Sequence, residues 1–303
     1  MESGRPDPAG VHMMAALKSI ARKLGLDTRN IYQLASARSI DAAVREQGLT
    51  ELRKRLREII PDLRDQYTGV LDETEYARYW EIKMRSHHAF QIDSALHVLE
   101  TIGGEDLNVV DVGDSSGNHC NYLKALAPPG RIARTVSINL DPVAVEKVRE
   151  KGGEAVLCRA EEIETQGLTP DLMLLFETLE HFSDPLRFLH TMAANGNIEN
   201  ILLTVPYRAD SRFGGALIRQ PYSSLPARIT PEVLHIMELS PDDWSLLAML
   251  AGYRTSFRRI YLQYPRRSPL RAMRPLWRKF DFEGFLALYL QRDTSLSDRY
   301  TGW

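Results

Sequence analysis

One short segment of the chain combines carboxylates and an imidazole at close spacing. Residues 174–189 read LLFETLEHFSDPLRFL and contain Glu177, Glu180 and His181, and a second histidine, His235, follows later. A histidine titrates near neutral pH and can take a proton from an acceptor group. Because Glu177 and His181 are four residues apart, one helical turn would place them on the same face. The segment predicts proton transfer by His181, assisted by Glu180 and His235.

The same side chains also suit a metal ion. Two carboxylates and two imidazoles are ligands that a divalent cation accepts. The alternative interpretation is therefore a metal site formed by Glu177, Glu180, His181 and His235, and both interpretations stay open.

A second candidate is the glycine-containing loop in VVDVGDSSGNH, residues 109–119. Gly113 permits a tight turn after an apolar run. Gly117 would let the N-terminus of the next helix approach a ligand, where the helix dipole favours a negative or polar group. The loop matches neither the P-loop nor the full dinucleotide-binding pattern. It predicts a binding site for the polar end of some other ligand.

The elements that must position these residues follow from the apolar pattern. Short β-rich runs alternate with helical stretches at 107–112, 132–138, 154–158, 172–176 and 201–205, and two further runs lie at 255–263 and 285–291. Asp141, Asp184 and Ser240 each precede a proline, which is typical of a capped helix start. The pattern predicts an α/β fold with a doubly wound, mostly parallel, seven-stranded sheet.

The residues before this sheet read as helices, at 12–24, 49–60 and 76–99. Short helices are marginal alone, so this helical block needs another part of the protein to pack on, and we expect it to cover the site and to offer a dimer surface. The predicted division is listed by residue range: a flexible tail at 1–10, an N-terminal helical region at 11–104, and a binding domain at 105–303 with insertions at 206–233 and 264–283. Insertions at strand ends commonly shape ligand sites.

Composition and charge limit the partners and the location that we expect for this protein. The chain has 303 residues, 38 of them Lys or Arg and 40 Asp or Glu, with a formal net charge of −2. This balance argues against nucleic acid as a partner. No apolar run approaches the roughly 20 residues needed to span a bilayer. Two cysteines, Cys120 and Cys158, are read as small buried packing residues, and their low number favours a reducing, cytoplasmic location.

One region departs from this balance. No acid lies between Asp243 and Asp281. The basic residues there are Arg254, Arg258, Arg259, Arg266, Arg267, Arg271, Arg274, Arg278 and Lys279, with Tyr261, Tyr264 and Trp277 among them. Three interpretations stay open: a clamp for a phosphate-bearing acceptor, a peripheral contact of residues 254–280 with the inner membrane face, or a solvated surface.

From about Asn108 to Tyr253 the order of these features resembles the class I S-adenosylmethionine-dependent methyltransferases. The family's acid-x-Gly-x-Gly-x-Gly motif is represented by Asp111, Gly113, Ser115 and Gly117, with serine at the middle glycine. The LEH segment and residues 235–254 match relatives that act on small molecules and glycans. By this resemblance the cofactor is held by Asp111, Gly113, Asp114, Ser115, Gly117, Asn139, Leu140, Ala160, Glu161, Phe176 and Glu177.

The resemblance has two departures and leaves alternatives. Asn139 stands where an acid usually grips the ribose, and its hydrogen bond would lack charge assistance; Arg159 replaces a third-strand acid. The resemblance implies O-methylation of a polar small molecule or a sugar. The ExxEH pattern also resembles metal-dependent 2′-O-methyltransferases that act on RNA or a diol with Mg²⁺. A third possibility is a catalytically silent binding protein. His87 and His88 are read as ordinary exposed or partly buried helix residues.

Overall fold

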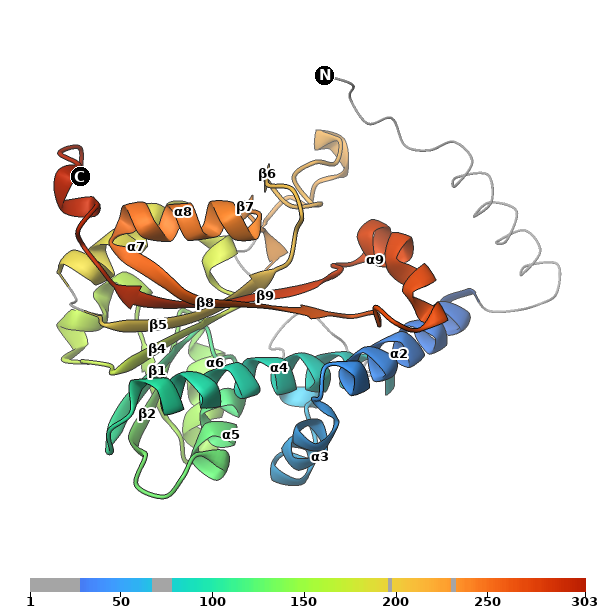
Figure 1. Ribbon diagram of the computed structural model, residues 1–303, viewed down its shortest axis with the longest axis horizontal. Coiled ribbons are helices and arrows are strands. Elements are labelled where there is room, and N and C mark those ends of the chain that lie inside the picture. Colours follow the sequence, from blue (N-terminus) through green and yellow to red (C-terminus); the bar gives the residue numbers. More distant parts are fainter. Residues whose placement is uncertain (1–27, 67–77, 196–197, 230–232) are drawn as a thin grey trace.

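A seven-stranded sheet runs through the centre of the protein (Figure 1). The computed structural model describes residues 28–66, 78–195, 198–229 and 233–303, so the predicted tail at 1–10 and helix at 12–24 lie outside the described residues. The strands are β1 (Leu107–Val112), β2 (Ile132–Asn139), β3 (Glu154–Leu157), β4 (Leu172–Phe176), β5 (Asn200–Pro206), β8 (Tyr253–Leu262) and β9 (Gly284–Arg292). All seven predicted strands are confirmed, and with them the predicted fold class.

The strand order, β3-β2-β1-β4-β5-β9-β8, brings the predicted site residues to one edge. Strands β1, β2, β3, β4 and β5 pair in parallel, so their carboxyl ends meet there. Strand β9 runs antiparallel between β5 and β8. Because Phe285 at its start pairs with Pro206 at the end of β5, residues 282–285 join the same edge.

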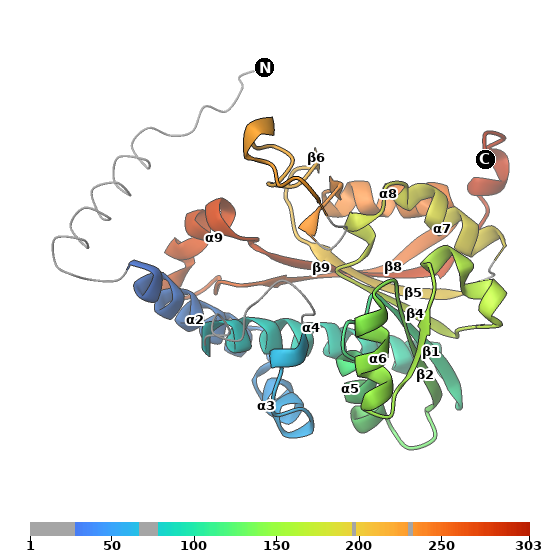
Figure 2. The same cartoon turned by 180° about the vertical axis from the view of Figure 1, so that it is seen from behind.

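Helices cover both faces of this sheet (Figures 1 and 2). One face carries α4 (Arg78–Ile102), α5 (Asn118–Leu126) and α6 (Pro142–Glu150), together with α2 (Thr28–Glu46) and α3 (Thr50–Ile59). The other face carries α7 (Pro185–Ala194) and α8 (Pro241–Ala251). This arrangement is doubly wound, as the alternation of strands and helices predicts.

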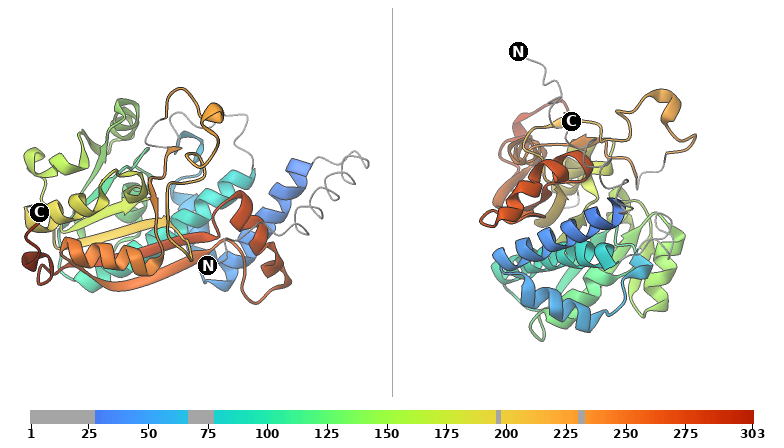
Figure 3. Two further views of the ribbon diagram at one scale, coloured as in Figure 1. Left: turned by 90° about the horizontal axis from the view of Figure 1, so that it is seen from above. Right: turned by 90° about the vertical axis from the view of Figure 1, so that its right-hand side faces the viewer.

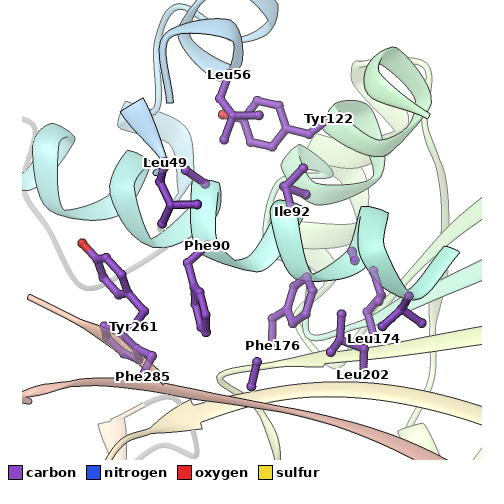
Figure 4. Packing of buried hydrophobic residues seen from close by; sticks show 14 of the residues in the cluster. Leu49, Leu56, Phe90, Ile92, Tyr122, Leu174, Phe176, Leu202, Tyr261 and Phe285 are labelled. Atoms are coloured by element: carbon purple, nitrogen blue, oxygen red, sulfur yellow. The ribbon is translucent and has the colours of Figure 1, made fainter. Parts of the chain in front are cut away.

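The N-terminal helices share one core with the sheet. Phe90 of α4 is 1% exposed and belongs to the same apolar cluster as Leu174 and Leu202 of the sheet and Leu49 and Leu56 of the helical region (Figure 4). Fully burying a side chain of this kind contributes about 2 kcal/mol. Helix α4 packs directly on the sheet, whereas α3 packs on α4 and α5, so the expectation that these helices need a partner to pack on is confirmed for both.

Three helices begin with the predicted capping device. Asp141 accepts a hydrogen bond from the backbone of Val143 at 2.9 Å, and Asp184 accepts one from Arg187 at 2.9 Å. Ser240 does the same for the third helix. Each cap precedes a proline at the first helical position, where the absent N–H has no partner to lose.

The insertion after β5 is an extended loop that projects from the body of the molecule (Figure 3). It contains β6 (Arg212–Phe213), paired with β7 (Met237–Glu238). Helix α9 (Arg274–Phe280) precedes β9, and the 3₁₀ turns are η1 (Arg64–Gln66), η3 (Ala160–Gln166), η4 (Leu179–His181), η5 (Tyr222–Ser224), η7 (Pro269–Met273) and η8 (Ser297–Arg299). Within the described parts of the chain, no helix has the length and apolar character to cross a bilayer.

Candidate active site

The glycine loop joins the end of β1 to α5. Gly113 has a φ of +90°, and a Cβ there would lie 2.6 Å from Oγ1 of Thr178, so the predicted tight turn is confirmed. Gly117 has a φ of +74° and faces Cγ1 of Val148 at 3.3 Å. Its small size therefore serves the packing of α6, and that it also lets the N-terminus of α5 approach a ligand stays a prediction.

Side chains predicted to touch the ligand also hold the loop in shape. The Asp114 carboxylate accepts the N–H of Gly117 at 3.0 Å and the hydroxyl of Ser137 at 3.0 Å. Asn139 donates from its amide nitrogen to the Asp114 carbonyl at 3.2 Å, and its oxygen accepts the N–H of Asp141. A ribose hydroxyl at Asn139 would share an amide that already has partners. Leu140 and Glu161 are exposed, whereas Ala160 is buried.

Gln66 in η1 also contacts the loop, and sequence reasoning missed it. Its amide nitrogen donates to Oγ of Ser115 at 3.3 Å, and its amide oxygen accepts from Ser116 and Asn118. Only 6% of Gln66 is exposed. The sequence carries no signal for this contact, because a lone glutamine before the sheet has nothing to mark it.

A buried acid–histidine pair lies behind the loop. Nδ1 of His119 lies 2.9 Å from Oδ2 of Asp111. Burial raises the pKa of Asp111 to about 6. Burial alone would lower the pKa of His119, but the Asp111 carboxylate raises it above its ordinary value. His119 was missed too, although its place in GNH directly after the loop could have indicated it.

Glu177 follows β4 in an unusual backbone conformation, with a φ of +51°. Its Oε1 lies 3.6 Å from Nε2 of His87 on α4, and burial raises its pKa to about 8. The His87 ring stacks on Phe285 at a centroid distance of 3.7 Å. His87 and His88 are 4% and 1% exposed, so reading them as ordinary exposed or partly buried helix residues is wrong. Burial lowers the pKa of both rings.

The segment after Glu177 is not the α-helical turn that the spacing predicts. Residues 179–181 form the 3₁₀ turn η4, preceded by the left-handed Glu177. Nδ1 of His181 lies 2.9 Å from the carbonyl of Leu234, to which it donates in the tautomer that makes Nε2 the acceptor of the neutral ring. The backbone N–H of Ile236 donates to the carbonyl of Glu180 at 2.8 Å. These two bonds attach the segment that follows the insertion, residues 234–236, to the turn.

The turn and the segment after the insertion bring together three of the four predicted metal ligands. Atoms of Glu180, His181 and His235 lie within 4.8 Å of one another, and the two imidazole rings meet edge to face at 4.8 Å. Glu180 is 1% exposed, and burial, followed by the Glu177 charge, raises its pKa well above the ordinary range. Glu177 is not in this cluster, because its carboxylate lies beside His87.

The basic segment is largely neutralised by acids from elsewhere in the chain. Arg258 pairs with Asp242, and Arg259 pairs with Asp93. Glu283 accepts from both Arg274 and Arg278. These pairs weaken the interpretation of the whole stretch as a phosphate clamp or membrane surface. A hollow of about 250 Å³ borders it and contains none of the predicted site residues; its lining is Glu46, Gln47, Ile260, Leu262, Tyr264, Arg266 and Arg267.

Several solved structures are similar in fold, at low identity. The 1,6-didemethyltoxoflavin-N1-methyltransferase of Burkholderia thailandensis is 14% identical and aligns over 75% of this chain and 93% of its own, with a TM-score of 0.46. An S-adenosylmethionine-dependent methyltransferase of Mesorhizobium loti is 13% identical over 66% of this chain and 100% of its own, with a TM-score of 0.43. No curated protein matches the sequence.

The family comparison covers more than half of the chain. The model of a methyltransferase domain matches residues 84–283, from within α4 to the start of β9. The matched stretch contains the glycine loop, both clusters of acids and histidines, and every strand of the seven-stranded sheet except β9. The chain therefore belongs to the class I S-adenosylmethionine-dependent methyltransferases.

Proposed function

We propose that the protein transfers a methyl group from S-adenosylmethionine to an oxygen of a polar small molecule or sugar. The observation that carries this proposal is a set of buried polar atoms without hydrogen-bond partners in the described part of the chain, all near the carboxyl edge of the sheet. They include Oδ1 of Asp111, Nε2 of His119, Oε1 of Glu177 and both carboxylate oxygens of Glu180. Buried polar atoms are normally paired, so such a gathering is expected where a ligand binds.

The residues around the glycine loop fit the proposed cofactor. Oδ1 of Asp111 is a buried acceptor without a described partner, which suits an ammonium group such as that of the methionine end. The left-handed turn at Gly113 and the start of α5 would hold the same end, and Asn139 would share its amide with the ribose. When bound, the cofactor supplies an electrophilic methyl group on a sulfonium.

His181 is the proposed base on the acceptor side. With Nδ1 donating to the Leu234 carbonyl, Nε2 of the neutral ring, which lies 3.9 Å from Oε1 of Glu180, carries the lone pair that general base catalysis requires. His235, whose ring meets that of His181, and Glu180 would orient the acceptor hydroxyl. A protonated Glu177, with a pKa of about 8, would donate a hydrogen bond without repelling an anion. In-line methyl transfer depends on this kind of positioning.

A metal-dependent variant of the reaction is a second candidate. The close approach of Glu180, His181 and His235 favours it, and Mg²⁺ on a diol or RNA acceptor is the specific form. Methyl transfer in the presence of excess chelator separates the two. Full activity with chelator would contradict the metal-dependent form, and a silent binding protein would show cofactor affinity without turnover of any acceptor.

A screen with methyl-labelled cofactor tests the main proposal, starting with nucleotide sugars as acceptors. With a hit in hand, His181→Asn is expected to lower the rate at least about 100-fold while leaving cofactor affinity within about two-fold. His190→Asn on α7, where Nδ1 lies 3.3 Å from the Ala251 carbonyl, is the matched control. Equal rates for the two variants would contradict a base role for His181. The cytoplasmic location, the homodimer and the division into regions at 11–104 and 105–303 stay predictions.

A further inference from the structure

Arginines meet two buried carboxylates where the insertion after β5 faces the start of β9. Glu238 in β7 has a side chain only 1% exposed, and that of Glu283 is 8% exposed. The arginines around them are Arg208, Arg212, Arg274 and Arg278. Two arginines share each carboxylate, and Asp210 is a further acid that acts on Arg208, so the question is which arginine is least well paired.

Arg212 is well matched within the chain. Its guanidinium reaches Oε2 of Glu238 at 2.7 Å through both Nε and Nη2. The other carboxylate oxygen, Oε1, lies 3.1 Å from Nδ1 of His235. Both oxygens of Glu238 therefore have close partners already.

Arg208 is poorly matched by comparison. Its Nη1 lies 3.5 Å from the Glu238 oxygen that Arg212 already engages, and its buried Nε has no hydrogen-bond partner within the described ranges. Burial, followed by the charge of Arg212, lowers its pKa. A buried donor without a partner costs free energy, and a guanidinium next to a second one is stabilised by an additional anion.

The position of Arg208 connects it to the proposed acceptor side. It lies two residues beyond the end of β5, the strand that neighbours the one carrying Glu177 into the site. From the shared partner Glu238 the contacts continue to His235 and on to the ring of His181. His235 also stacks on Phe282 at 5.4 Å, so an aromatic wall flanks the arginines.

We propose that Arg208, supported by Arg212, binds an anionic group of the methyl acceptor, a carboxylate or a phosphate, beside His181. The proposal rests on the proposed function for its place in catalysis. The Nε–H and one Nη–H of a guanidinium form a fork that matches two oxygens of either anion. The acceptor is thus a molecule that carries both a hydroxyl and a negative charge, with a flat or apolar part against Phe282.

Small aromatic probes test this directly by calorimetry, in the presence of S-adenosylhomocysteine. Phenyl phosphate and benzoate provide the two anions, and benzyl alcohol is the neutral analogue. We expect the wild-type protein to bind at least one anion about 10-fold or more tightly than the alcohol. The preferred anion distinguishes a phosphate-bearing from a carboxylate-bearing acceptor, and no anion preference at all would overturn the proposal.

Variants locate the effect. Arg208→Gln is expected to weaken the preferred anion at least about 10-fold, and Arg208→Lys, which keeps the charge but lacks the fork, is expected to recover part of the binding. Arg228→Gln, an exposed arginine of the same insertion, is the control and should bind like wild type. Anion binding unchanged in Arg208→Gln, or equally reduced in Arg228→Gln, would overturn the proposal.

A titration of S-adenosylhomocysteine alone distinguishes failure of the anion-site proposal from failure of the proposed function. If it binds and the anions do not, the anion site is wrong and the proposed function stands. If it does not bind while the probes still depend on Arg208, the cofactor proposal fails and the anion site remains. The thermal midpoint of each variant shows whether Arg208→Gln is folded, and Arg208→Lys decides the question if it is not.

Discussion

The two halves of the sheet edge treat their polar groups differently. On the glycine-loop side, Asp114 and Asn139 have their hydrogen bonds supplied by neighbouring backbone and side chains. On the side of β4 and β5, both carboxylate oxygens of Glu180 and Nε of Arg208 lack a hydrogen-bond partner in the described segments. The loop is thus shaped largely by its own hydrogen bonds, whereas on the second side polar atoms of functional interest are left without partners in the described residues.

The difference assigns a separate task to each side. A loop that is held rigid by its own hydrogen bonds suits a cofactor that binds in every turnover, because preorganisation lowers the free-energy cost of binding. Under the proposed function, the unpartnered polar atoms of the second side gain partners when an acceptor binds. The pair formed by Asp111 and His119 joins the two, since Oδ1 of Asp111 and Nε2 of His119 also lack partners while their other ring and carboxylate atoms bond.

Breaking the Asp111–His119 pair should have the largest effect. His119→Leu leaves the Asp111 carboxylate buried without its partner and should lower the free energy of unfolding by about 3 kcal/mol at pH 8. Chemical denaturation measures this. The loss should be smaller at pH 5, because an unpartnered Asp111, whose pKa is already about 6, takes up a proton. His97→Leu, at an exposed histidine of α4, is the control, and equal losses would contradict a special pair.

Gly113→Ala tests the rigidity of the loop. The left-handed φ and the Thr178 hydroxyl both oppose a Cβ there, so we expect about 2 kcal/mol lower stability and at least about 10-fold weaker cofactor affinity. Gly130→Ala is the matched control, because its φ is +76° but no atom lies within 4 Å of the new Cβ. It should lose only about 1 kcal/mol and bind the cofactor normally. Similar behaviour of the two variants would contradict the predicted role of the turn.

The acceptor side should respond to pH through Glu177. Its folded-state pKa of about 8 lies above the ordinary value of 4.5, so stability is highest when the carboxyl is protonated in both states and falls as pH rises from about 5 to 8. Glu177→Gln should make this pH-dependent decrease in the free energy of unfolding smaller by about 1–2 kcal/mol, after allowance for solvent screening. Denaturation at pH 5, 7 and 8.5 measures it. Glu58→Gln, an exposed residue of α3, should leave the pH dependence unchanged, and an unchanged slope in Glu177→Gln would count against a buried, protonated carboxyl.

Asn139→Ala should have the smallest effect. It removes one hydrogen bond to the Asp114 carbonyl and one from the Asp141 backbone, worth about 1 kcal/mol together because Asn139 is only partly buried. We expect about 3- to 10-fold weaker cofactor affinity by calorimetry, and a smaller change for Asn121→Ala on α5. A complete loss of affinity would show that Asn139 grips the ribose as strongly as an acid, contrary to its shared hydrogen bonds.

Most of the fold could be predicted from the sequence because its signals are local. Runs such as Leu107–Val112 and Leu172–Phe176 match β1 and β4 in both bounds, and the three prolines behind Asp141, Asp184 and Ser240 mark helix starts. The glycine loop was likewise identified from its spacing.

The details of the site depend on contacts between distant segments, which no local pattern carries. Gln66 reaches the loop from 49 residues before Ser115. The turn at residues 179–181 is not the predicted α-helical turn, because Glu177 before it has a left-handed backbone conformation. The spacing of the residues alone gave no sign of this conformation. Arg259 pairs with Asp93, which lies 166 residues away in the sequence. The absence of acids within the basic segment therefore suggested a larger positive charge than the folded protein has there.

A calorimetric titration of S-adenosylhomocysteine into wild-type protein, Gly113→Ala and Gly130→Ala tests the cofactor site most directly. The account predicts saturable one-site binding to wild type and Gly130→Ala, and binding at least about 10-fold weaker to Gly113→Ala. No saturable binding to the wild-type protein at about 1 mM ligand, or equal affinity in all three proteins, would contradict it.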